Sequence, residues 1–177
     1  SLFKNFNADS KNSSNFKNRS ENNIRGIFQF NSKFPLQKEG EKYLSTLTPI
    51  FVAKLNPQNN KNINNDERLI DYSNIYLIDR LSSSTTLEGG ESVTLGNEFK
   101  LLSNNDKSSE IFSLNLAASF RADENLDLPK SSFISQKTSN IVGQSYIRLN
   151  DFLDLEYDFL SDNNLGQFHY HNINSKI

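Results

Sequence analysis

A row of three carboxylates near the C-terminus most restricts how this chain can fold. Asp154, Glu156 and Asp158 alternate with apolar residues. Those apolar residues are Leu153, Leu155, Tyr157 and Phe159. Successive side chains of a β-strand point to opposite faces, so the carboxylates share one face and the apolar residues share the other. Because burying unpaired charges is very costly, the carboxylate face must meet water.

The same alternation defines two further strands upstream. Over residues Ser92–Leu102, one face is apolar and the other carries Thr94, Glu98 and Lys100. Over Glu110–Arg121, apolar residues again alternate with small or polar ones. The apolar positions of the two strands include Val93, Leu95, Phe99, Phe112, Leu114 and Leu116. Segments of about 11 residues are long enough to cross a bilayer as tilted strands.

Weaker patterns predict additional strands. Ile24–Asn31 alternates, and Ile141–Leu149 alternates weakly. Leu47–Leu55 is apolar and β-branched, but Pro49 interrupts it, which indicates a sheet edge, a bulge or a strand start. Phe168 and Tyr170 mark the face of a last strand. The run Ser73–Leu81 fits either a short helix or a strand, since so short a run has no decisive period.

These patterns predict the organisation of the chain. Residues 1–23 are rich in Asn, Ser and Lys and are predicted to be a polar loop. Residues 24–177 are predicted to be strands with long loops at 57–91 and 122–138. The chain begins at Ser1 and ends in a patterned stretch, so we interpret it as a piece of a longer protein.

Composition narrows the class of protein. Hydrophobic residues make up 35% of the chain, yet it holds 14 Phe and 6 Tyr. A polar chain with many aromatic residues is typical of a membrane β-barrel, which needs apolar residues only at alternate positions. There is no run of 18 apolar residues, so no transmembrane helix is predicted. On pattern alone, a soluble antiparallel sheet and a barrel wall are equally favoured.

The sequence offers little for catalysis or metal binding. The two histidines, His169 and His171, are two residues apart, but two histidines without further ligands do not make a metal site. No GxSxG motif is present. Gly89-Gly90 lacks phosphate-loop spacing and is predicted to form a turn or a strand start. With no cysteines and a net charge of -2, disulfides and a basic nucleic-acid surface are excluded. We predict a non-enzyme without catalytic, cofactor or metal residues.

A series of motifs resembles the LptD family of LPS-assembly proteins. The first lies in residues 74–81 (NIYLIDRL) and is followed by residues 87–90 (LEGG) and 93–96 (VTLG). The family-like residues singled out in it are Asn74, Arg80, Gly89 and Gly90. Downstream, residues 120–121, 127–129, 136–143 and 157–159 are similar to the later barrel of the family. Two features depart from it: Thr85-Thr86 stand where many members have a second Asp-Arg pair, and the cysteines of some members are absent.

The resemblance implies an all-β fold, with antiparallel strands forming part of a transmembrane barrel in the bacterial outer membrane. The implied function is insertion of lipopolysaccharide into the outer leaflet. The implied partners are lipopolysaccharide, outer-membrane lipid, an LptE-like lipoprotein plug and, through a missing N-terminal domain, components of the periplasmic Lpt bridge. Nucleic acid and cofactors are not implied.

In such a barrel the two faces of each strand have separate roles. The predicted lumen-facing row is Thr94, Glu98, Lys100, Asp154, Glu156 and Asp158. The predicted lipid-facing residues are Val93, Leu95, Phe99, Phe112, Leu114, Leu116, Leu153, Leu155, Tyr157 and Phe159. One alternative is a soluble or surface-exposed β-sandwich that acts as a binding or adhesin domain, which needs two packed sheets. Another is an outer-membrane enzyme barrel with a nucleophile near His169 or His171.

Overall fold

The computed structural model describes residues 1–8, 21–104 and 109–176. These residues form strands and a short 3-10 helix, η1 (Lys130–Ser132). The strands are β1 (Leu2–Ala8), β2 (Glu21–Lys33), β3 (Leu36–Glu39), β4 (Tyr43–Asn56), β5 (Gly90–Ser103), β6 (Glu110–Arg121), β7 (Ile141–Asn150), β8 (Leu153–Ser161) and β9 (Phe168–Lys176).

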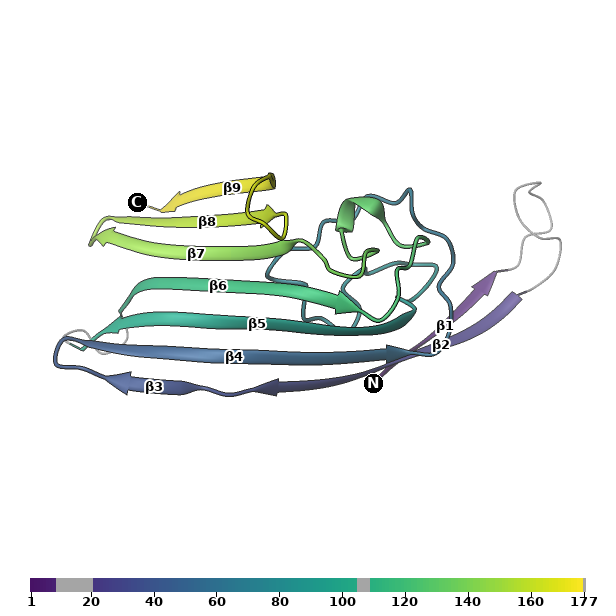
Figure 1. Ribbon diagram of the computed structural model, residues 1–177, viewed down its shortest axis with the longest axis horizontal. Coiled ribbons are helices and arrows are strands. Elements are labelled where there is room, and N and C mark those ends of the chain that lie inside the picture. Colours follow the sequence, from purple (N-terminus) through teal and green to yellow (C-terminus); the bar gives the residue numbers. More distant parts are fainter. Residues whose placement is uncertain (9–20, 105–108, 177) are drawn as a thin grey trace.

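All of these strands belong to one antiparallel sheet (Figure 1). Its order is β1-β2-β4-β5-β6-β7-β8-β9, and β3 pairs with β4 beyond the end of β2. The predicted all-β, antiparallel fold is therefore confirmed. Within the described part of the chain, β1 and β9 are the two edges of the sheet.

The predicted strands from residue 24 onward are present with small changes at their ends. Residues 1–23 were predicted to be a polar loop, and this is wrong for Leu2–Ala8, which pair with Glu21–Ile27 of β2. Residues 9–20 lie outside the described residues. The first long loop ends at residue 89 rather than 91, and the second runs to residue 140.

Two local predictions need correction. Ser73–Leu81 is neither helix nor strand but a series of turns, because Asp71 binds the backbone there. The Asp71 carboxylate accepts hydrogen bonds from the N–H groups of Ser73 and Asn74, at 2.8 and 3.1 Å. Short polar side chains that bind nearby backbone groups compete in this way with regular structure.

Pro49 also differs from the prediction, because it lies inside the 14-residue strand β4. On one side it pairs with Asn97 of β5, and on the other its carbonyl accepts the N–H of Phe34 at 3.1 Å. In an antiparallel strand, the N–H and C=O groups of one residue point to the same side. The N–H that Pro49 lacks would therefore point away from β5, toward the break between β2 and β3. The proline therefore leaves the ladder with β5 intact.

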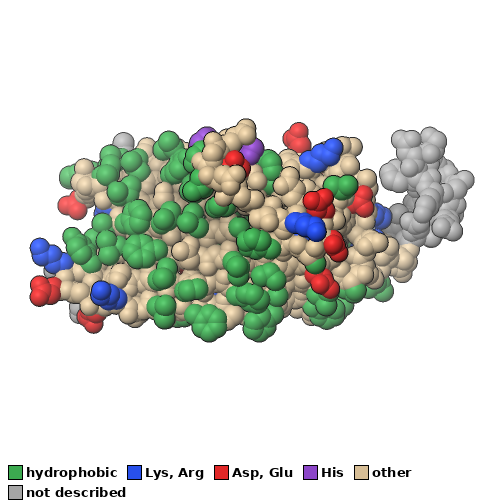
Figure 2. All heavy atoms as spheres, in the orientation of Figure 1, with side chains coloured by type: hydrophobic (Ala, Val, Ile, Leu, Met, Phe, Trp, Pro, Cys, Tyr) green, Lys and Arg blue, Asp and Glu red, His purple; other side chains and the backbone are tan. Residues whose placement is uncertain are grey.

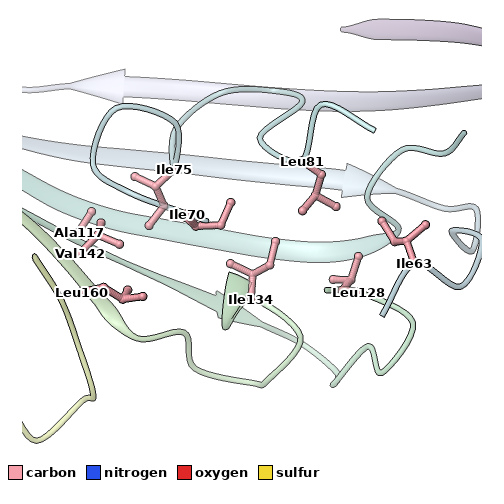
Figure 3. Packing of buried hydrophobic residues seen from close by; sticks show 9 residues of the cluster. All are labelled: Ile63, Ile70, Ile75, Leu81, Ala117, Leu128, Ile134, Val142 and Leu160. Carbon is pink, nitrogen blue, oxygen red and sulfur yellow. The ribbon is translucent and has the colours of Figure 1, made fainter. Parts of the chain in front are cut away.

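The two long loops fold over one face of the sheet and form the hydrophobic core with it (Figure 3). Ala117, Val142 and Leu160 lie side by side on β6, β7 and β8. The loops supply the remaining buried residues, which are Ile63, Ile70, Ile75, Leu81, Leu128 and Ile134. The core therefore lies between loops and sheet, on the face that also carries the polar strand residues.

Gly96 is expected to be needed for the first loop to lie against β5. A Cβ built at Gly96 would overlap the Tyr76 hydroxyl and lie 2.7 Å from the Leu116 carbonyl oxygen. Gly96→Ala should therefore destabilise the protein by about 1–3 kcal/mol, measured by thermal unfolding in detergent micelles. Gly166→Ala is the matched control, since its nearest neighbour would lie at 3.6 Å. Equal stability of both variants would contradict this packing.

Candidate functional site

One face of the sheet, here called the apolar face, is hydrophobic and uncovered within the described structure. It carries the residues predicted to face lipid, which the strand register brings to the same side. Ile24 and Phe30 are each 63% exposed, and Ile173 is 70% exposed. Figure 2 shows hydrophobic side chains spread over the strands, whereas charged side chains gather toward the two ends. Such a large apolar surface needs a covering partner.

The opposite face, here called the polar face, carries the residues predicted to face a lumen. Register aligns Thr94 with Ser119, Lys100 with Ser113, and Glu156 with Tyr146. The charged residues of this face are largely paired across strands. The ion pairs are Lys33–Glu98 at 3.0 Å, Lys100–Glu110 at 3.1 Å and Arg148–Asp154 at 3.2 Å. The Asp158 carboxylate instead accepts hydrogen bonds from the amides of Gln144 at 3.0 Å and Asn172 at 3.2 Å.

A buried charge cluster of Arg80, Glu88 and Arg121 fastens the first long loop to the polar face. The Arg80 guanidinium donates two hydrogen bonds to the Glu88 carboxylate, at 2.6 and 2.7 Å. Arg121 of β6 donates a third at 2.6 Å. The three side chains are 0–5% exposed. Arg80 also donates to the Ser119 hydroxyl at 2.9 Å, so loop and sheet share a single network.

Glu88 stays ionised in this cluster despite its burial. Burial by itself raises the pKa of the carboxyl, but the charges and hydrogen bonds of Arg80, with Lys54 and Arg121, outweigh it and bring the pKa from 4.5 to about 2. Paired charges of this kind are tolerated in an interior because each is neutralised and hydrogen-bonded.

This lowered pKa predicts a loss of stability in acid. Because the folded pKa lies below the unfolded value, the unfolded chain takes up the proton first, and stability falls as pH falls. The contribution of Glu88 should be complete above pH 4.5 and be lost progressively toward pH 2. Unfolding in micelles across this range measures it, and Glu88→Gln should show a shallower decline. An equal decline in both proteins would contradict the assignment.

The family-like residues have structural positions in the first long loop and at the start of β5. Asn74 supports the turn by donating to the Leu69 carbonyl at 3.1 Å. A Cβ at Gly89 would lie 2.6 Å from the Gln58 carbonyl oxygen, so the two segments can touch only at a glycine. Gly90 has φ of +89°, a left-handed conformation that suits glycine at the start of β5. The strand-start role predicted for Gly89-Gly90 agrees with this geometry.

The two histidines have different surroundings. The His171 Nδ1 lies 2.8 Å from the Tyr157 hydroxyl, while the His169 ring packs on Phe133 with centroids 4.7 Å apart. Across the described ranges, no group of three or more His, Cys, Asp or Glu residues is placed to hold a metal ion. In those same residues, no helix is long and apolar enough to cross a membrane.

The cations and the anion that hold the loop were not predicted to form one cluster. Glu88 and Arg121 lie within the family-like motifs, but neither was assigned a partner. Arg25, Lys54 and Arg121 occupy inward strand positions, where they donate to the carbonyls of Asn59, Leu77 and Gly89. The alternation gave no signal for their burial, because it assigns these positions to the water-facing side of the strands.

Comparison with known proteins gives a match to one family model. The model of the LptD family, described as LPS transport system D, matches residues 3–177. The matched region includes both long loops and the buried charge cluster. A search of curated proteins gives no match.

Proposed function

Because this chain belongs to the LptD family, we propose that its strands are a segment of the wall of an outer-membrane translocon that inserts lipopolysaccharide into the outer leaflet. The family acts in lipopolysaccharide transport, and the predicted family membership is confirmed.

The observation that carries the proposal is the contrast between the faces of one sheet. In a barrel wall the apolar side meets lipid and the polar side meets the lumen. The uncovered apolar face supplies the first surface, and the polar face with its paired charges supplies the second. A soluble sandwich would instead need a second sheet packed on the apolar face. Within the described residues all strands lie in one sheet, which disfavours that alternative.

The connections between strands give the wall an orientation. Residues 57–89 and 122–140 lie together at one end, while short turns such as residues 40–42 and 151–152 lie at the other (Figure 1). Outer-membrane barrels have long extracellular loops and short periplasmic turns. The two long loops, and the charge cluster that holds them, would thus lie at the cell-surface end of the barrel and fold into its lumen.

In this proposal the wall binds and guides rather than catalyses. Its partners would be lipopolysaccharide and outer-membrane lipid, an LptE-like lipoprotein inside the lumen and the periplasmic bridge, which would connect through a domain outside this chain. The part of the polar face nearest the short turns is left uncovered by the two loops, so a lumenal partner has room there.

Depletion of the protein in the cells that make it tests the proposal. Newly made lipopolysaccharide should then accumulate at the inner membrane and decline at the surface, as measured by labelling and membrane fractionation. Levels of another outer-membrane barrel serve as the control for general envelope damage. Normal delivery of lipopolysaccharide after depletion would overturn the proposal.

A further inference from the structure

The polar face contains a hollow near the short-turn end of the sheet. Its volume is about 380 Å³, and it is lined by residues of β5, β6, β7 and β8, among them Lys100, Asn115, Tyr146 and Glu156. Binding sites for small ligands have volumes of roughly 300–1,000 Å³. The hollow is therefore large enough for a small ligand or for one or two units of a longer one.

Two side chains in the hollow have hydrogen-bonding capacity to spare. Asn115 is only 8% exposed, yet its Oδ1 has no hydrogen-bond partner in the described structure. Buried amide oxygens are almost always paired, so an unpaired one marks a place where a ligand or water can bind. Glu156 lines the same hollow from β8, two strands away; it is exposed and has neither a cation nor a donor among the described residues.

The charges around the hollow select the kind of ligand. The Lys100 ammonium is already paired with the Glu110 carboxylate at 3.1 Å. The Glu156 carboxylate adds a negative charge without a compensating cation. A phosphate would meet net negative charge here, and it needs strong donors that are free. Neutral hydroxyl groups, in contrast, can donate to Glu156 and Asn115 Oδ1 and accept from the Asn115 amide.

We propose that this hollow is a binding site for a neutral saccharide, held by Asn115 and Glu156 without any contribution from phosphate. The inference rests on the proposed function in one respect, since it takes the polar face to be accessible to a sugar-bearing substrate. It adds that this wall holds the substrate through uncharged sugar units, while the phosphates are bound elsewhere.

The test compares two probes on the full-length protein in detergent micelles. The probes are the core oligosaccharide released from lipopolysaccharide, either dephosphorylated or with its phosphates intact. Saturation-transfer NMR and calorimetry should give similar affinities for both. Glu156→Gln and Asn115→Leu should each weaken binding about tenfold, as expected for loss of a hydrogen bond in which the partner stays buried or charged. Asn31→Leu is the matched control and should bind normally, since Asn31 is on the same face but on β2, outside the hollow.

The outcomes separate this inference from the proposed function. Binding that requires phosphate, or that is lost in Lys100→Gln but not in Glu156→Gln, would overturn the inference. Absence of saccharide binding to the unmodified protein would overturn it as well, even if depletion still stops lipopolysaccharide delivery. Because Glu156 is exposed, Glu156→Gln should fold normally. This variant therefore decides the test even if Asn115→Leu does not fold.

Discussion

Replacing Glu88 by glutamine is expected to destabilise the protein by about 3–5 kcal/mol, because it leaves two buried guanidinium groups without a counter-charge. Arg80 is 0% and Arg121 is 3% exposed in their side chains, so water cannot take the place of the carboxylate. Thermal unfolding in detergent micelles, followed by circular dichroism, measures the loss. Glu91→Gln is the matched control, since Glu91 is exposed three residues further along the chain.

The same variant should also release the first long loop. Arg80 and Glu88 belong to the loop, whereas Arg121 and Ser119 belong to β6, so their network is one of the main attachments between loop and sheet. Trypsin should therefore cleave within residues 57–89 faster in Glu88→Gln than in Glu91→Gln. A double variant, Glu88→Gln with Arg121→Gln, should lose less than the sum of the single losses, because the two groups share one interaction. Additive losses would contradict a shared cluster.

The strands could be predicted from the sequence because a half-buried strand has a period of two. Residues such as Leu114 and Leu116 alternate with Ser113 and Asn115, and the structure places these two sets on opposite faces. The same reasoning failed for β1 and β3. β1 has only seven residues, and its apolar residues Leu2, Phe3 and Phe6 do not alternate with polar ones. All four residues of β3 are exposed, so it has no buried face that a pattern could reveal.

The arrangement of the loops could not be predicted from the sequence. Ile63, Ile70 and Ile75 are scattered through an Asn-rich segment without any period, and the strand residues of their core, Ala117, Val142 and Leu160, lie 40 or more residues away. For the candidate site, Arg80 and Glu88 both lie in the family-like motifs, but their pairing was not predicted. The pairing depends on a loop path that Gly89, Gly90 and Gly96 permit through close contacts, and such contacts leave no local pattern.

Leu155→Arg and Leu114→Arg are each expected to destabilise the folded protein in lipid vesicles by about 2–4 kcal/mol, if the apolar face lies against the middle of the membrane. Both leucines lie on that face among apolar neighbours: Leu155 pairs with Ile147, and Leu114 with Phe99. The guanidinium would have to leave water for hydrocarbon, where hydrogen-bond partners are scarce. Denaturant unfolding of the vesicle-inserted protein gives the difference in free energy.

A matched arginine on the polar face separates the effect of lipid from that of the substitution itself. Asn174 is exposed and pairs with Glu156 on the polar face, one residue from the Ser175 that pairs with Leu155. Asn174→Arg should change stability by less than about 1 kcal/mol, since exposed charge pairs contribute little. If Leu114→Arg, Leu155→Arg and Asn174→Arg lower the free energy of unfolding equally, the apolar face is not in lipid. A large loss confined to residues 114 and 155 would place that face in the membrane and the carboxylates of β8 on the watery side.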